Sequence, residues 1–227
     1  MKIRRVTLEN CHEVDGVVVV IDVLRAFTTA AFAFYRGADE ILLVSTVEEA
    51  FDLRAQNSDC LIIGEVEGLP VKGFDIPNSP TAIARMNLNS RRLIQRTTAG
   101  TQGAVLATKA DQLFAASLCV GARTAKCIQA LSPEIVTFVE TGVHSKGGGD
   151  EDVACSDYIA GFLFGTPPKS VDIRNRVLNS PAAHKFTGTE HSDFPQTDVE
   201  HALMIDRFDF AMAVERKDDL LVLRAVK

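Results

Sequence analysis

Residues 17 to 29 read VVVVIDVLRAFTT, and this stretch decides the fold. Its first five residues are apolar and mostly β-branched, without the alternation of a half-buried strand. Such a run predicts a strand buried on both faces, as in a parallel sheet. Asp22 then falls at the strand's carboxyl end and Arg25 at the start of a helix, where open α/β sheets bind their ligands. The alternatives are that Asp22 caps this helix or pairs with Arg25.

The rest of the chain continues the alternation of strands and helices. Apolar runs predict further strands at 40–44, 60–63, 93–94, 113–116 and 135–139, with helical patterns between them. Two runs near the end, 211–215 and 220–225, predict an antiparallel hairpin. The expected architecture is a three-layer α/β/α fold with a mixed, mostly parallel sheet. The sequence contains no linker or repeat, so we expect one domain over residues 1–227.

Composition limits the partners and the compartment. A net charge of -6 argues against nucleic acid, whose phosphates select basic surfaces. No apolar run is long enough for a membrane span, and the N-terminus lacks the apolar segment of a signal peptide. Five cysteines without a CxxC pair favour reduced thiols. We therefore expect a cytoplasmic protein that binds neither nucleic acid nor membrane, and a homodimer is left open.

Loops that follow the predicted strands carry polar residues. The loop after residues 60–63 holds Glu65, Asp75, Asn78 and Ser79, and Ser79-Pro80 predicts a helix start. The loop at 96–101 reads RTTAGT, with threonine hydroxyls and a glycine before a helix. We predict that this loop binds a phosphate or sulfonate through its N–H groups. The alternative is a structural turn with Gly100 in a left-handed conformation and Thr101 as the cap.

A glycine-rich loop leads into an acidic helix start at 147–152, GGGDED. Because the helix dipole favours carboxylates there, a plain first-turn acidic cluster is the alternative to a functional site. Together with Asp22 and Glu65, these hard oxygen ligands indicate Mg²⁺ or Mn²⁺ in preference to zinc. Carboxylates beside anion-binding loops suggest phosphoryl chemistry.

Several familiar sites are excluded. The sequence has no GxxxxGK[ST] and no GxSxG motif. Phosphatases of the haloacid dehalogenase type need a second Asp two residues after the first, and here that position is Leu24. The five histidines show no metal-ligand spacing, and His144 is expected to be a solvated loop residue.

These motifs resemble the 2-phosphosulfolactate phosphatases, the ComB-type enzymes of coenzyme M biosynthesis. The matching elements, in family order, are VVVVIDVLRAFTT at 17–29, GE at 64–65, GFDIPNSP at 73–80, TTAGT at 97–101 and GGGDEDVAC at 147–155. The resemblance implies an α/β/α fold and a Mg²⁺-dependent phosphatase. It departs at Val66, where the family commonly has Arg, and at Ala99, where it commonly has Asn.

The leading hypothesis is therefore hydrolysis of 2-phosphosulfolactate, or a close phosphorylated hydroxy acid, to sulfolactate and phosphate. The alternatives are a related phosphomonoesterase with another small anionic substrate and a non-catalytic anion-binding homologue. The residues expected to take part are Asp22, Arg25 and Asp75 in catalysis, Asn78, Ser79, Arg96, Thr97, Thr98, Gly100 and Thr101 in substrate binding, and Asp22, Glu65, Glu151 and Asp152 as Mg²⁺ ligands.

Overall fold

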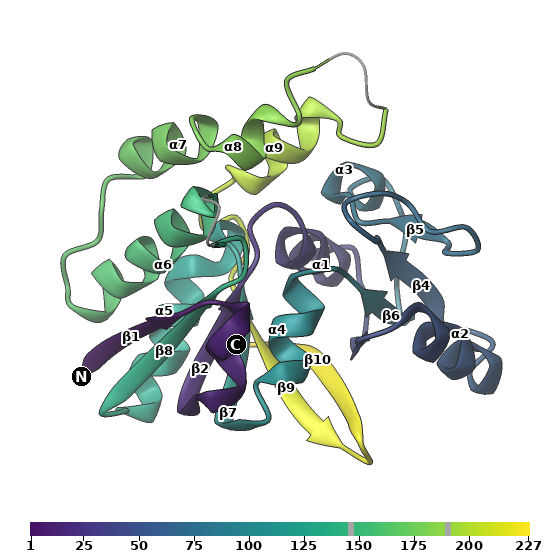
Figure 1. Ribbon diagram of the computed structural model, residues 1–227, viewed down its shortest axis with the longest axis horizontal. Helices are drawn as coiled ribbons and strands as arrows, with labels where there is room; N and C mark the ends of the chain where they lie inside the picture. The colour runs from purple at the N-terminus through teal and green to yellow at the C-terminus, as the bar shows by residue number, and fades with distance from the viewer. Residues whose placement is uncertain (145–147, 189–191) are drawn as a thin grey trace.

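A computed structural model describes residues 1–144, 148–188 and 192–227 of the chain. Its strands form one sheet of order β1-β8-β2-β7-β9-β10-β3-β6-β4-β5 (Figure 1). The strands are β1 (Lys2–Val6), β2 (Asp15–Ile21), β3 (Glu40–Val44), β4 (Leu61–Gly64), β5 (Ile76–Pro77), β6 (Arg92–Arg96), β7 (Lys109–Ala116), β8 (Ile135–Glu140), β9 (Ala211–Lys217) and β10 (Leu220–Val226).

Helices occupy most of the connections between these strands. They are α1 (Ala26–Tyr35), α2 (Val47–Gln56), α3 (Pro80–Ile83), α4 (Gly100–Leu106), α5 (Gly121–Leu131), α6 (Asp150–Leu163), α7 (Ser170–Leu178), α8 (Pro181–His184) and α9 (Gln196–Ala202), with short 3-10 turns η1 (Leu8–Glu13) and η2 (Leu118–Val120). Figure 1 shows α7, α8 and α9 together along one side of the molecule.

Strand β2 is buried on both faces, as its apolar run predicts. Val18 and Val20 belong to one core cluster, with Phe27 of α1. Val19 and Ile21 point the other way, into a second cluster with Ile159 of α6. Alternate residues of a strand face opposite sides of a sheet, so helices cover both faces. The predicted three-layer α/β/α architecture is confirmed.

The C-terminal hairpin, yellow in Figure 1, lies in the middle of the sheet. Strand β9 pairs antiparallel with β7, and β10 pairs antiparallel with β3. The other strand pairs, apart from β9 with β10, are parallel. The predicted mixed, mostly parallel sheet is therefore confirmed. The hairpin joins two parallel halves, β1-β8-β2-β7 and β3-β6-β4-β5.

Because the hairpin pairs antiparallel with both neighbours, the two halves have opposite strand directions. Their carboxyl ends nevertheless come together. Five steps along the strand order separate β2 from β6, and a twist of about 20–25° per step rotates them by roughly 100–125°. Gln95 of β6 accordingly donates a hydrogen bond to the carbonyl of Ala26, the first residue of the helix that follows β2, at 3.0 Å. Twist places both sets of strand-end loops around one site.

Strand β1 is not predicted by the apolar pattern. Its sequence KIRRV is mostly charged, because it forms an edge of the sheet and is largely solvent-exposed. All five cysteines lie within the described residues and are free thiols, as expected. Within the described residues, no helix combines the length and the apolar character that crossing a membrane requires.

Candidate functional site

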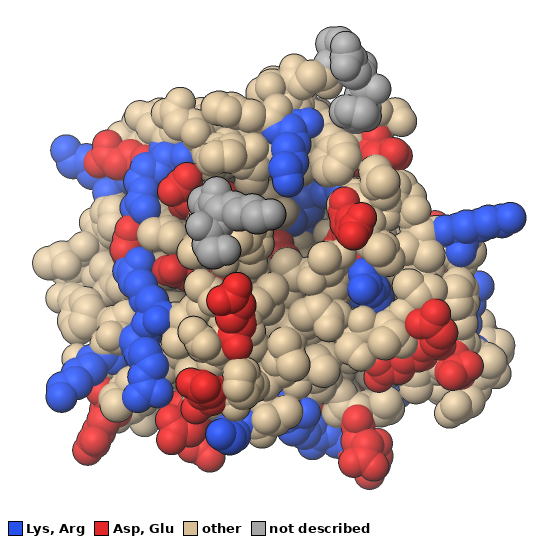
Figure 2. Space-filling model, viewed as in Figure 1, with Lys and Arg blue, Asp and Glu red and all other residues tan. Residues whose placement is uncertain are grey.

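A pocket of about 580 Å³ lies where the loops after β2, β4, β6 and β8 meet. Its wall combines acidic and amide side chains with basic and aromatic ones. Figure 2 shows acidic and basic residues around a hollow near the middle of the face drawn in Figure 1. The predicted site residues that line the pocket are Asp22, Arg25, Glu65, Asn78, Thr98 and Glu151.

Asp22 both caps helix α1 and lines the pocket. Its Oδ1 accepts the N–H of Ala26 at 2.9 Å, and the N–H of Gly100 also donates to its carboxylate. Burial raises the pKa of Asp22 to about 7, the two N–H donors oppose that rise, and the charges of Glu65 and Glu151 add to it. Asp22 therefore binds the first N–H of α1, although Arg25 occupies the N-cap position, and this contact is compatible with a functional role in the pocket.

The RTTAGT loop binds protein groups instead of presenting an empty anion cradle. Thr98 donates its N–H and its hydroxyl to the Glu65 carboxylate. The N–H of Thr101 donates to the Thr97 hydroxyl at 3.0 Å, and Thr101 lies inside α4, whose N-cap position is Ala99. Gly100 does not have a positive φ, and its N–H donates to Asp22. The alternative of a left-handed Gly100 with Thr101 as the cap is wrong. Anion binding at this loop stays a prediction, with the N–H groups of Thr98 and Gly100 already donating to carboxylates of the protein.

Two of the four predicted metal ligands have their oxygens occupied by protein donors. In Asp152, Oδ1 accepts the N–H of Val23 at 2.8 Å and Oδ2 that of Gly142 at 2.8 Å. Glu65 accepts from Thr98 and from the N–H of Gly68. Both carboxylates are buried and tie the strand-end loops together. These hydrogen bonds indicate that Asp152 and Glu65 hold the loops in position.

Glu151 differs from its neighbours in the acidic helix start. Its side chain is buried, lines the pocket, and carries an Oε2 without a hydrogen-bond partner in the described residues. Burial is the main cause that raises its pKa. Asp150 is exposed, and Gly147 lies outside the described residues. The acidic cluster is thus a first-turn cluster in which Glu151 also faces the pocket.

Arg25 is held by a buried carboxylate that the sequence analysis did not single out. Its guanidinium donates to Asp198 Oδ2 at 3.0 Å and to the carbonyls of Asp193 and Gly68 at 2.7 and 3.0 Å. The rings of Phe186 and Phe194 lie 5.2 and 4.9 Å from it. Arg25 therefore clamps distant segments of the chain around the pocket and does not pair with Asp22.

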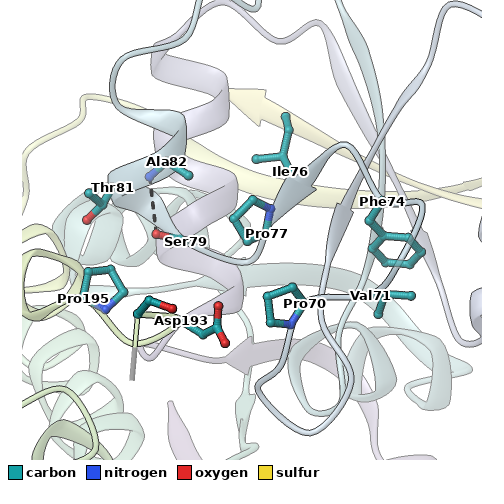
Figure 3. A pocket seen from close by; sticks show the side chains of 11 residues that line it. Pro70, Val71, Phe74, Ile76, Pro77, Ser79, Thr81, Ala82, Asp193 and Pro195 are labelled. Atoms are coloured by element: carbon teal, nitrogen blue, oxygen red, sulfur yellow. Dashed lines mark hydrogen bonds between the residues drawn. The ribbon is translucent and has the colours of Figure 1, made fainter. Parts of the chain in front are cut away.

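Ser79 and Asp75 lie outside this pocket. The Ser79 hydroxyl donates to Asp198 Oδ1 at 2.7 Å and caps α3 by accepting the N–H of Ala82 at 3.3 Å. Figure 3 shows it on the wall of a neighbouring, mainly apolar pocket. Asp75 pairs with Arg54 at 2.5 Å and accepts the N–H of Ile62. An acid–base role for Asp75 has no geometric support.

Of the remaining predicted residues, some line the pocket and others bind other parts of the protein. Asn78 is buried at the pocket wall, and its Oδ1 has no partner among the described atoms. Arg96 donates to the carbonyls of Ser45 and Glu65. Of the two departures from the family pattern, Ala99 lines the pocket, whereas Val66 bridges to Leu69 within its own loop.

The sequence analysis also did not single out Lys185 and Phe186, which line the pocket from a segment more than a hundred residues after Asp22 and Glu65. Their local sequence carries no motif. His144, expected to be a solvated loop residue, is exposed and lines the pocket.

The donor set fits a Mg²⁺ ion only in part. Among the residues that the structure describes, no group of three or more His, Cys, Asp or Glu side chains is arranged to hold a metal. Mg²⁺, however, keeps several waters and commonly uses one or two carboxylates together with substrate phosphate. Asp22 and Glu151, with the unpaired Oε2 of Glu151, meet that smaller requirement. The four-carboxylate set is larger than the geometry supports.

Gly100 is required because Asp22 packs against it. A Cβ at this position would lie 2.7 Å from the Ala26 Cβ and 2.8 Å from Asp22 Oδ2. Gly100→Ala is therefore expected to cost about 1–3 kcal/mol of stability through overpacking and to lower kcat about 10–100-fold by displacing Asp22. Chemical denaturation and steady-state kinetics measure the two effects. Gly188→Ala, where an added Cβ meets no atom within 4 Å, is the control. Unchanged kcat in folded Gly100→Ala would contradict this role.

Comparison with known proteins agrees with the resemblance seen in the motifs. A family model described as 2-phosphosulpholactate phosphatase matches residues 4–215. A probable 2-phosphosulfolactate phosphatase of Bacillus subtilis is 35% identical over 209 residues, which cover 92% of this chain and 91% of that protein. Proteins with the same description from Clostridium perfringens and Deinococcus radiodurans are 37% and 35% identical, over 82% and 78% of this chain and 74% and 73% of theirs. The chain belongs to the 2-phosphosulfolactate phosphatase family.

Proposed function

We propose that this protein is a Mg²⁺-dependent phosphatase that hydrolyses 2-phosphosulfolactate to sulfolactate and phosphate. The observation that carries the proposal is that Asp22 and Glu151 line one pocket, where the buried Oε2 of Glu151 has no hydrogen-bond partner among the described residues. The identity of the substrate ester is taken from the names of the relatives, which are described as probable 2-phosphosulfolactate phosphatases. Water provides the oxygen that bonds to phosphorus, the ester P–O bond breaks, and a proton ends on the leaving alcohol.

Asp22 and Glu151 would hold the metal ion. Bound there, Mg²⁺ would neutralise charge on the phosphoryl group, the contribution that divalent ions make to phosphoryl transfer. The chain's own residues fix the geometry. The N–H groups of Ala26 and Gly100 hold the Asp22 carboxylate. Asn78 offers an amide at the same wall, where it can contact the substrate or ordered water.

A related ester of a smaller acid is the second candidate substrate. Ala99 lines the pocket at a position where the family commonly has Asn, so one amide contact is missing. Phosphate release from 2-phosphosulfolactate, 2-phospholactate and glycerol 2-phosphate, each with Mg²⁺ and with EDTA, tests both candidates. The proposal requires metal-dependent turnover with 2-phosphosulfolactate preferred. Preference for 2-phospholactate would favour the second candidate, and no turnover of any ester would refute both.

Glu151→Gln tests the metal site without relying on activity. Ligands that bind only the folded state stabilise it. Millimolar Mg²⁺ is therefore expected to raise the melting temperature of the wild type by a few degrees, about 1 kcal/mol or more at ten times the dissociation constant. Glu151→Gln should lose most of that rise. Asp150→Asn removes the exposed neighbouring carboxylate and should keep it. Equal Mg²⁺ responses in all three proteins would rule out Glu151 as a ligand.

A further inference from the structure

The pocket presents more negative charge than an anionic substrate tolerates without help. Asp22, Glu65 and Glu151 all line it. The proposed ester carries a carboxylate and a sulfonate in addition to its phosphate. A metal ion at Asp22 and Glu151 would compensate only the phosphate. A second cationic group is needed for the acidic groups remote from phosphorus, since a buried anion needs a paired donor.

Arg25 lines the pocket but is already neutralised. It forms an ion pair with the buried carboxylate of Asp198 at 3.0 Å and donates to two carbonyls. The rings of Phe186 and Phe194, whose centroids lie 5.4 Å apart, also pack beside the guanidinium. Its net electrostatic attraction for a further anion is therefore small. The substrate's second anionic group requires a different cation.

Lys185 is placed to supply that charge. It follows α8 directly and lines the same pocket, with an exposed side chain. Within residues 1–144, 148–188 and 192–227 it makes no ion pair or hydrogen bond with a side chain. Burial raises the pKa of Glu151, and the charge of Lys185 opposes part of that rise. A flexible ammonium group near the carboxylates proposed to hold the metal ion can reach an anion a few bonds from phosphorus.

The segment that carries Lys185 is anchored to the pocket. Pro181, Ala182 and Phe186 line it as well, and Phe186 packs on the Arg25 guanidinium. Ser180 caps α8 by accepting the N–H of Ala183 at 3.1 Å. The backbone at Lys185 is thus held in place while its side chain remains free to turn toward a ligand.

We propose that Lys185 is a specificity-determining residue, which binds the carboxylate or sulfonate of the substrate and selects esters with a second anionic group. The inference rests on the proposed function and deepens it. Lys185 takes no part in bond breaking, so its removal acts on KM for charged esters. A lysine with a merely structural role would affect all esters alike.

The test compares wild type, Lys185→Gln and Lys185→Arg on 2-phosphosulfolactate and on glycerol 2-phosphate, which lacks a second anionic group. Lys185→Gln is expected to lower kcat/KM for 2-phosphosulfolactate about tenfold or more, mainly through KM. The value for glycerol 2-phosphate should change less than about twofold. Lys185→Arg should restore most of the loss. Lys169→Gln, at an exposed lysine before α7, is the matched control. An equal loss on both esters, or no loss on either, would overturn the proposal.

Product inhibition separates this inference from the proposed function. Lys185→Gln should weaken the binding of sulfolactate, followed by thermal shift or calorimetry, and leave the binding of inorganic phosphate unchanged. This measurement does not require turnover. If the wild type hydrolyses no ester, the proposed function fails, while the contrast between sulfolactate and phosphate still decides the role of Lys185. Equal sulfolactate affinity in wild type and Lys185→Gln would refute it.

Discussion

Asp22→Asn is expected to reduce kcat by about a thousandfold or more and, at pH 8, to make the folded protein more stable. The catalytic loss follows from removing a carboxylate that would hold the metal ion beside the transferring phosphoryl group. The gain in stability follows from removing a buried charge. Burial raises the pKa of Asp22 from 3.8 to about 7. This is a difference of about three pKa units, or up to about 4 kcal/mol at 1.36 kcal/mol per unit.

The sign of the pH dependence is fixed by that shift. Between pH 4 and pH 7 the folded protein keeps a proton on Asp22 that the unfolded chain has lost. Stability therefore falls as the pH rises through this range. In Asp22→Asn this fall should be reduced, because the group no longer titrates. One hydrogen-bond acceptor is lost as well, at about 1 kcal/mol, so the net gain at pH 8 should be about 2–3 kcal/mol.

Denaturant unfolding at pH 4 and pH 8 in EDTA measures this effect, and phosphate release in Mg²⁺ measures the catalytic one. Asp111→Asn, at an exposed position of β7, should change neither. A folded Asp22→Asn protein with near-normal kcat would exclude Asp22 from the reaction. If the free energy of unfolding changed equally between pH 4 and pH 8 in the variant and the wild type, Asp22 would be ionised in the folded protein over that whole range.

Asp198→Ala is expected to destabilise the protein by about 3–5 kcal/mol, the cost of leaving a buried charge without its partner. Asp198 is fully buried and accepts from Arg25, from the Ser79 hydroxyl and from the N–H of Thr81. Its loss frees α3 and α9 from the loop after β2. Thermal or denaturant unfolding measures the change.

Two further variants separate the contribution of the ion pair to stability from that of the hydrogen bonds. Asp198→Asn keeps an acceptor for Ser79 and Thr81 but leaves Arg25 unpaired, so it should remain strongly destabilised. Adding Arg25→Met to Asp198→Asn should recover part of the stability, because both charges are then gone. If the double variant is no more stable than Asp198→Asn alone, the unpaired arginine is not the cause.

Local pattern was sufficient to predict most elements of this fold. The apolar run at 17–21 predicts a strand buried on both faces, and β2 has that burial because helices cover both sides of the sheet. Ser79-Pro80 predicts a helix start, and Ser79 does cap α3. In each case the physical cause lies within a few residues of its effect.

Features that depend on distant partners were not predictable in this way. The hairpin pattern at 211–225 gives no information on which strands lie beside it, so its central position was not foreseen. Asp198 is separated from its partner Arg25 by 173 positions in the sequence. The RTTAGT loop has the composition of an anion-binding loop. Its N–H groups at Thr98 and Gly100, however, donate to the carboxylates of Glu65 and Asp22. A sequence does not reveal that such donors are already used by the protein itself.

The central hairpin has a consequence for biosynthesis. Ribosomes deliver β1 to β8 well before β9 and β10, so β7 and β3 emerge with an unpaired edge that only the last strands can cover. Exposed strand edges readily pair with other chains. Until translation reaches residues 211–226, the two half-sheets are nascent-chain intermediates of the kind that chaperones bind. The sheet is therefore completed only after β9 and β10 have been made, and the pocket between the halves forms with it.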